Sequence, residues 1–294
     1  MDYLAIDIGG TRTKSAIVNS EGKFKNKENI PTPDKYEELI SYIVRRFLEN
    51  KIDSNTIGLS CPGVYSPKNK TITGSSALSY LINKNIINDI RASLNDVKII
   101  IENDGNCALL GEISTGEYDK INNILMLVVG SAIGGSAIVD GNLIRGANLN
   151  AAEFGYMMID NNVERSKYHS LGGKCGLNGL LNYINERGFS ISNGKELFYK
   201  MSENKELYSL VKNQLKYLAL SIINLQYILD PDLVLIGGGI SKNEKFINIR
   251  KDNINEIMTL RANYKVKPKI EAAKQGNDAN LLGIAYKCRE DLEN

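Results

Sequence analysis

One acidic residue stands inside an apolar strand near the start of the chain and is followed by two glycines and a threonine. The stretch reads AIDIGGTRTKSAIV over residues 5–18 and contains Asp7, Gly9, Gly10 and Thr11. Aspartate and glycine are poor strand formers, so they weaken a sheet unless they serve another purpose. One interpretation is a plain hairpin turn that needs glycine, and the other is a loop that binds phosphate through its backbone amides. The stretch alone does not decide between the two.

Two further glycine-rich turns also follow apolar strands. They are GSAIGG at 130–135 and GGG at 237–239. Glycine in such turns lets backbone N–H groups approach an anion closely. Three turns of this kind, each at the end of a strand, indicate a phosphorylated ligand held in a cleft between sheets. Neither GxGxxG nor GxxxxGK[ST] occurs, so neither a Rossmann nor a Walker loop is supported.

A carboxylate beside a phosphate loop is also suited to hold a cation. Magnesium prefers hard oxygen ligands and usually keeps several of its waters. Asp7 stands at a strand end next to the first glycine turn, to which Thr11 and Thr13 add hydroxyl groups. We therefore predict that Asp7 anchors Mg²⁺ through water.

A second polar cluster lies in IIIENDGN at 99–106, where an apolar strand meets a predicted helix. Capping of that helix by Asn103 or Asp104 is the simpler interpretation. Beside three phosphate-type turns, however, the Asp104 carboxylate is predicted to accept the proton of an attacking hydroxyl. Help from a general base of this kind is typically worth about 10²–10⁴-fold in rate.

A third acidic residue, Glu153, lies in NLNAAEFGY at 148–156. It follows two small residues and precedes a glycine, a setting in which a carboxylate can project into a cleft. A solvated surface acid is the alternative.

These residues need strands and helices to position them, and the chain alternates between the two. Strands are predicted at 3–8, 14–19, 23–29, 56–60, 97–101, 124–129, 135–139 and 233–236. Helices are predicted at 107–113, 205–229 and 279–291, and another is opened by Thr32 and Pro33. The chain therefore reads as an α/β protein with two lobes, residues 1–116 joined by the terminal helix 279–294, and residues 117–278.

Composition narrows the class of protein. The 294 residues are 43% hydrophobic and 24% charged, with a net charge of +2 and no long run of like charges. This is ordinary for a globular protein with a large core, and it does not favour nucleic acid or a membrane surface as a partner. The longest apolar run, 124–129, is too short for a membrane span, no targeting segment is visible, and the four cysteines lie far apart. We therefore expect a cytoplasmic protein with reduced thiols.

With these stretches in order, the chain resembles the ROK family of repressors and sugar kinases, which has the actin-like ATPase (ribonuclease H-like) fold. The first turn resembles that family's phosphate motif DIGGT-x-x-K, which ends at Lys14. Residues 129–155 match its signature V-G-x-x-I-G-G-x-x-x-x-D-G-x-x-x-x-G-x-x-x-x-A-x-E-x-G. The other matching stretches are GLSCPG at 58–63, END at 102–104, GGGIS at 237–241 and NDANLLGIA at 277–285.

The resemblance implies ATP-dependent phosphorylation of a hexose hydroxyl, usually at C6, with magnesium. Asp104 would be the base, and Gly63, Asn103 and Glu153 would contact the sugar. The residues on the phosphate and magnesium side would be Asp7, Gly9, Gly10, Thr11, Lys14, Ser131 and Gly134. Gly238 and Gly239 would lie on the adenosine side. The resemblance also implies a homodimer.

Two departures from the family pattern follow Glu153. Many members place histidine after E-x-G and then C-x-C-G-x-x-G-C, which together bind zinc; here the first position is Tyr156 and only Cys175 is nearby. A structural zinc site needs about four ligands, so we predict none. A further sugar-binding glutamate of the family falls near His169, which is either satisfied locally or bonded to a sugar hydroxyl. Tyr156 is either a packing residue or a substitute sugar contact.

The same departures bear on the sugar. Without the zinc motif, and with GSSALSYL at 74–81 in place of the Ala-Asn-Leu run of glucose-specific members, the chain looks more like N-acetylmannosamine kinases, which implies a role in sialic acid catabolism. Glucokinase or β-glucoside kinase is the alternative. A repressor is disfavoured because the nucleotide motif begins at Asp7 and no basic footprint is present. An intact Asp104 argues against a catalytically dead sugar sensor.

Overall fold

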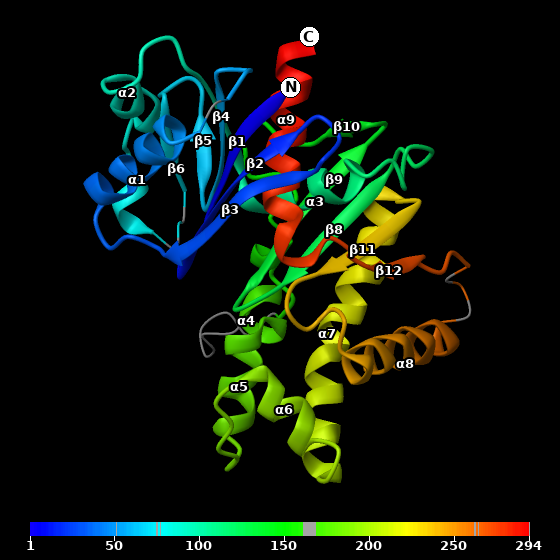
Figure 1. Cartoon of the computed structure of the whole chain (residues 1–294). Helices are drawn as coiled ribbons and strands as arrows, with labels where there is room; N and C mark the ends of the chain where they lie inside the picture. The colour runs from blue at the N-terminus through cyan, green and yellow to red at the C-terminus, as the bar shows by residue number, and fades with distance from the viewer. Residues whose placement is uncertain are drawn as a thin grey trace. The chain divides into compact units, whose positions relative to one another are not determined.

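The computed structural model describes residues 1–50, 52–74, 76, 78–160, 169–261, 263 and 265–293 (Figure 1). The chain divides into two compact units. The first unit comprises Met1–Asp119, Ala147–Asn150 and Asn277–Asn294, and the second comprises Lys120–Gly146 and Ala151–Gly276. Each unit contains a five-stranded sheet covered by helices, so the α/β class predicted from the sequence is confirmed.

The sheet of the first unit has the order β3-β2-β1-β4-β7. Its strands are β1 (Asp2–Ile8), β2 (Arg12–Asn19), β3 (Phe24–Pro31), β4 (Thr56–Cys61) and β7 (Lys98–Asn103). The first three form an antiparallel meander, whereas β4 and β7 run parallel to β1. Asp7 lies opposite Ser60, and Ser60 lies opposite Glu102. The carboxyl ends of three strands thus meet at one edge of the sheet. A short hairpin, β5 (Val64–Ser66) and β6 (Thr71–Thr73), follows β4.

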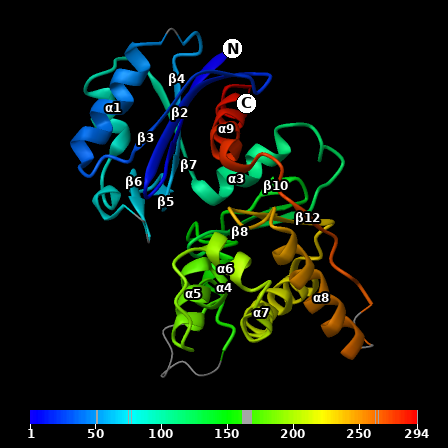
Figure 2. The same cartoon turned by 60° about the horizontal axis from the view of Figure 1, so that its bottom comes forward.

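Helices cover both faces of this sheet. Figure 1 shows α1 (Tyr36–Leu48) and α2 (Ile86–Arg91) on one side, and Figure 2 shows α3 (Asp104–Ile113) and α9 (Ala279–Glu293) across the sheet from α1. Alternate residues of a strand point to opposite faces. Leu4 and Ile6 accordingly pack in the core with α1 and α2, whereas Tyr3 and Ala5 pack with α9. Burial on both faces explains why β1 reads as a nearly continuous apolar run.

The predicted start of the first helix was wrong. Helix α1 begins at Tyr36, after Lys35, whose side chain makes no capping hydrogen bond. The Thr32 hydroxyl instead donates to the Gly9 carbonyl at 2.6 Å and lies 3.1 Å from the Thr13 hydroxyl. A tertiary contact with the glycine turn has taken the side chain that would otherwise cap the helix.

The sheet of the second unit has the order β10-β9-β8-β11-β12. Its strands are β8 (Ile124–Val129), β9 (Ile133–Val139), β10 (Asn142–Leu143), β11 (Leu233–Gly237) and β12 (Ile270–Ala272). Its helices are α4 (Leu171–Cys175), α5 (Leu177–Asn185), α6 (Gly194–Lys200), α7 (Lys205–Leu229) and α8 (Glu244–Leu260). They share one apolar core with β8, β9 and β11. No helix in the described part of the chain is both long and apolar enough to cross a membrane.

Candidate functional site

The Asp7 carboxylate is held from three directions within the first unit. Its Oδ2 lies 3.2 Å from Lys14 Nζ, which also donates to the Asn277 carbonyl at 3.1 Å. Its Oδ1 accepts from the Ser60 hydroxyl at 3.2 Å and from the Asn280 amide at 2.9 Å. Sequence reasoning missed Ser60 and Asn280 as site residues, although both lie in stretches that it quoted. The fixed Asp7 carboxylate is itself the kind of hard oxygen ligand that suits hydrated magnesium.

The first glycine turn is a hairpin in the structure. Strands β1 and β2 pair along their whole length, and the Gly9 amide donates to the Arg12 carbonyl at 3.0 Å. The Thr11 carbonyl accepts from the Thr32 amide at 3.1 Å. Gly10 and Thr11 are exposed, so their amides are the ones that a phosphate can reach. The hairpin interpretation is therefore confirmed, and phosphate binding by the same turn stays a prediction.

Asn103, in the END cluster, caps the N-terminus of α3, as in the simpler of the two interpretations. Its Oδ1 accepts from the amides of Gly105 at 2.8 Å and Asn106 at 3.2 Å. Its Nδ2 donates to the Gly63 carbonyl at 3.2 Å, and an amide nitrogen has a second hydrogen for another acceptor. Gly63 has φ of +104°, and a Cβ there would lie 3.2 Å from the Thr73 carbonyl oxygen, so only glycine suits this turn.

Asp104 is the first residue of α3 and is half-buried. Its Oδ1 accepts from the Gly105 amide at 2.9 Å, at the N-terminus of the helix. Asp7 and Glu102 lie in register on β1 and β7, with β4 between these strands. Because neighbouring strands lie about 4.8 Å apart, the backbones at these two residues are roughly 10 Å apart. Burial raises the pKa of the Cys61 thiol between them, and the charges of Asp104 and Asp7 raise it further. The carboxylates of Asp7 and Asp104 therefore both lie near Cys61, at the same edge of one sheet.

The GSAIGG turn of the second unit rests on the start of α5. The Gly130 carbonyl accepts from the Leu177 amide at 2.8 Å, and the Ser131 carbonyl accepts from the Asn178 amide at 3.1 Å. Ser131 is exposed, and Gly134 lies in β9. The carbonyl groups of Gly130 and Ser131 thus fix the turn, and the exposed Ser131 is accessible to a ligand.

The GGG turn connects β11 to the approach to α8. Gly238 has φ of +91°, and a Cβ there would lie 2.1 Å from the Val129 carbonyl oxygen, so no side chain fits. The Ser241 hydroxyl and amide both donate to the Gly238 carbonyl, at 2.8 and 3.1 Å. Gly239 is exposed, with no described atom within 4 Å of a Cβ placed there. This turn offers backbone and open space, which is what a flat ring needs for close approach.

The candidate sugar contacts of the second unit have few partners. The Glu153 carboxylate is half-buried and makes no hydrogen bond to the described residues, and burial raises its pKa. Within the same described residues, the buried Nδ1 of His169 is also unpaired. Tyr156 is 64% exposed, so it is not a packing residue. A buried polar group without a partner costs about 1–3 kcal/mol, and His169 Nδ1 shares this state with atoms of Ser136 and Arg250 among the described residues. Glu153 and His169 are thus free to bond a ligand.

The residues described here offer no group of three or more His, Cys, Asp or Glu side chains that could hold a metal ion. Cys175 is buried, and its Sγ donates to the Gln214 carbonyl at 3.3 Å. The predicted lack of a structural zinc site stays a prediction.

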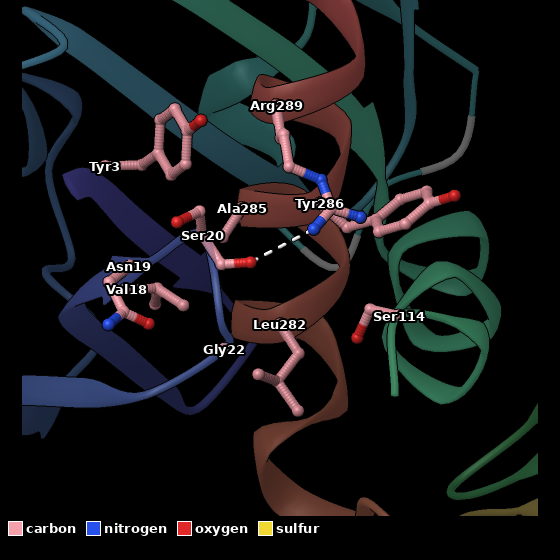
Figure 3. A pocket seen from close by; sticks show the side chains of 10 residues that line it. All are labelled: Tyr3, Val18, Asn19, Ser20, Gly22, Ser114, Leu282, Ala285, Tyr286 and Arg289. Carbon is pink, nitrogen blue, oxygen red and sulfur yellow. Dashed lines mark hydrogen bonds between the residues drawn. The ribbon is translucent and has the colours of Figure 1, made fainter. Parts of the chain in front are cut away.

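A small open hollow lies in the first unit beside α9 (Figure 3). The Arg289 guanidinium at its rim donates to the Ser20 carbonyl at 3.0 Å and lies 4.9 Å from the centroid of the Tyr286 ring. Tyr3 and Leu282 form part of its apolar wall. The hollow is lined by residues other than the predicted site residues, so it is separate from the candidate site.

Comparison with known proteins identifies the family. The ROK family model matches residues 3–290. The chain belongs to the ROK family. It is 30% identical over 291 residues to a beta-glucoside kinase of Listeria monocytogenes, and the match covers 97% of each chain.

Solved ROK structures are similar over their full length. A ROK family protein from Streptococcus pneumoniae TIGR4, solved in complex with sucrose, has a TM-score of 0.90 and 28% identity, covering 100% of this chain and 99% of that one. A protein from Listeria monocytogenes, provisionally named an N-acetylmannosamine kinase, has a TM-score of 0.85 and 28% identity, covering 99% and 100%. These matches confirm the predicted actin-like ATPase fold, and the chain is a sugar kinase of the ROK type.

Proposed function

We propose that this ROK kinase transfers the terminal phosphoryl group of ATP to the 6-hydroxyl of N-acetylmannosamine and gives N-acetylmannosamine 6-phosphate. The observation that carries the chemistry is the strand register that aligns Asp7, Ser60 and Glu102, with Asp104 immediately after β7. This register supports a phosphate side and a proton acceptor at one sheet edge, as the reaction requires.

In this proposal Asp104 takes the proton of the attacking hydroxyl. The hydroxyl oxygen forms its bond to the γ-phosphorus while the bond to the bridging oxygen breaks and ADP leaves. The Asn103 cap fixes the start of α3, so the position of Asp104 is set before substrates bind. Phosphoryl transfer depends mainly on such positioning and on charge neutralisation. Gly63, Asn103 and Glu153 contact the sugar.

Asp7, Lys14 and the glycine turns are proposed to hold the metal and the nucleotide. Asp7 would hold hydrated magnesium, which neutralises phosphate charge when bound, and its hydrogen bonds to Ser60 and Asn280 keep its carboxylate in place. Lys14 supplies a positive charge beside it. The backbone of the glycine turns would contact the phosphates at Gly9, Gly10, Thr11, Ser131 and Gly134, and the adenosine at Gly238 and Gly239.

The choice of N-acetylmannosamine rests on the segment after Glu153. Tyr156 replaces the histidine of the zinc motif, and its exposure, together with the unpaired Nδ1 of His169 among the described residues, supports direct contact of both with the sugar. The similarity to the Listeria monocytogenes protein provisionally named for this activity supports the same choice.

A β-glucoside kinase is the second candidate. It is favoured by the 30% identity to a beta-glucoside kinase and by the high TM-score to a ROK protein that binds sucrose, a disaccharide. An acceptor of this class would carry a second group at C1, close to the same exposed segment.

A panel of acceptors tests the proposal. N-acetylmannosamine, N-acetylglucosamine, glucose and cellobiose are assayed with Mg-ATP, and the product is located by phosphorus-coupled NMR. We expect the highest kcat/KM for N-acetylmannosamine, with the phosphate at C6. Removal of divalent metal by EDTA should abolish turnover, and a zinc-specific chelator should not. A preference of tenfold or more for glucose or cellobiose would overturn the amino-sugar assignment.

Two wider features are proposed with it. Because the phosphoryl donor is ATP, we place the enzyme in the cytoplasm. We also propose a homodimer, which light scattering of the purified protein tests.

A further inference from the structure

A buried lysine follows His169 in the second unit and pairs with the stretch that comes after Glu153 and Tyr156. Lys174, in α4, is 8% exposed. Its Nζ lies 2.8 Å from the Asp160 carboxylate and 4.5 Å from the centroid of the Tyr217 ring. The proposed chemistry does not use any of these three groups.

The stretch before Asp160 is paired with the stretch that leads into α4. The Ile159 amide donates to the His169 carbonyl at 3.0 Å, and the Leu171 amide donates to the Met157 carbonyl at 2.9 Å. An antiparallel bridge lies between these two bonds. The stretch that carries Glu153 and Tyr156 is thereby tied to the stretch that carries His169.

Helix α4 is in turn fixed to the long helix α7. The Gln214 side chain donates to the Lys174 carbonyl at 3.0 Å, and Cys175 donates to the Gln214 carbonyl at 3.3 Å. Tyr217, whose ring lies beside the Lys174 ammonium, also belongs to α7. A chain of contacts therefore runs from Asp160 through α4 to a rigid helix of 25 residues.

Stability alone is a weak reason for a charge pair in this place. A buried ion pair must repay the loss of water around both charges, and apolar residues of similar volume are often as stable. What such a pair does provide is a defined geometry, because the Lys174 ammonium is held between a carboxylate and the Tyr217 ring. The Glu196–Lys200 pair of α6 offers a contrast in its cation, since the side chain of Lys200 is 48% exposed and that of Lys174 only 10%, whereas the two carboxylates are similarly exposed, at 28% and 24%.

We propose that Asp160 and Lys174, with the Tyr217 ring, form a brace that holds the Glu153–Tyr156 stretch in position for the sugar. Asp160 and Lys174 are positioning residues that act through Glu153, Tyr156 and His169. The proposal rests on the proposed function, because that function assigns these three residues to the acceptor. Loss of the brace then weakens sugar binding and leaves ATP binding unchanged.

Four variants test the brace: Asp160→Asn, Lys174→Met, the double variant that carries both changes, and Lys174→Arg. We expect the first three to raise KM for the preferred sugar roughly 10- to 100-fold, as misplacement of a contact by about 1 Å does, with KM for ATP within about twofold of the parent. Lys174→Arg keeps a cation over the ring and should recover most of the affinity. The matched control Glu196→Gln breaks the exposed pair of α6 and should leave both KM values unchanged.

Hydrogen exchange supplies a readout apart from activity. Amides of residues 153–159 should exchange faster in Asp160→Asn than in the parent, and at the parent rate in Glu196→Gln. If a single variant does not fold, the double variant decides the question, because it removes both charges of the Asp160–Lys174 pair together.

A brace is ruled out if sugar KM stays within twofold of the parent while thermal stability falls, or if KM for ATP rises equally. If the parent phosphorylates no sugar, the proposed function fails by itself. The brace is then decided by exchange at 153–159, and unchanged protection in Asp160→Asn overturns it.

Discussion

The two units hold their candidate residues in opposite ways. In the first unit, the side chains of Asp7, Lys14 and Asn103 are bonded to partners in the same unit. In the second, the Glu153 carboxylate and His169 Nδ1 lack a hydrogen-bond partner within the described residues. The side chains of the first set have hydrogen-bond partners before any ligand binds, whereas those two groups of the second set have none among the described residues.

This difference matches the work proposed for each set. Groups that act on a transition state are most effective when they are fixed in advance, because no reorganisation is then needed during the reaction. Groups that recognise a sugar by its hydroxyls must be unpaired until it binds, which gives strong discrimination against the wrong acceptor. Substitutions at Asp7 and Asp104 should therefore lower kcat or the metal affinity, and substitutions at Glu153 and His169 should raise KM for the sugar.

The largest effect is expected from Asp104→Asn, which keeps the shape of the side chain but removes the base. We expect kcat to fall by about 10²–10⁴-fold with little change in KM for the sugar. Steady-state ADP release measures this. Asp96→Asn is the control, because Asp96 is exposed with φ of 55°, a conformation that asparagine also tolerates. Activity of Asp104→Asn within about tenfold of the parent would contradict the assignment.

Asn280→Leu tests whether the network around Asp7 matters. The change removes the amide that donates to Asp7 Oδ1, so the carboxylate loses one of its fixed positions. We expect the Mg²⁺ concentration for half-maximal activity to rise roughly 10-fold or more, as for partners of metal ligands generally. Asn248→Leu, on the exposed face of α8, is the control. An unchanged Mg²⁺ titration would show that Asp7 needs no support from α9.

Glu153→Gln examines the second unit. A charged acceptor is replaced by a neutral amide, so KM for the sugar should rise by about 10-fold or more while kcat changes less. In the parent, kcat/KM for the sugar should fall as pH drops through the raised pKa of Glu153, because protonation removes the charged acceptor. The variant should lack this part of the pH profile. A larger loss in kcat than in KM would place Glu153 with the first set of residues.

The smallest effect concerns stability. Because burial raises the pKa of Glu153 above its ordinary 4.5, ionisation costs the folded state free energy. That cost is absent below the unfolded pKa and complete above the folded one, so stability falls as pH rises between them. Glu153→Gln should remove this fall and give an equal or higher Tm at neutral pH. A lower Tm at neutral pH would mean that the carboxylate has a stabilising partner after all.

Local signals carried much of the fold prediction. Helix α7 has the predicted bounds of 205–229, because its apolar residues recur at helical spacing and Asp230 adopts a left-handed conformation before Pro231. The Asn103 cap and the first hairpin were each one of two interpretations of their stretches, and both are present in the structure. Helix α8 received no prediction, because 244–260 contains many polar residues and its apolar stripe is sparse. The start of α1 was wrong, since Thr32 bonds to a turn that is distant in sequence.

What the sequence determined by itself was therefore the set of glycine turns, the long helix α7 and the family motifs, because these depend on backbone angles and on residue spacing along the chain. Only the tertiary structure decided that Asn280, 273 residues away, would hold Asp7, and that Lys174 would be buried against Asp160. The reason is that such pairs depend on strand order and helix packing. A side chain becomes a partner or a buried charge only when distant segments are brought together.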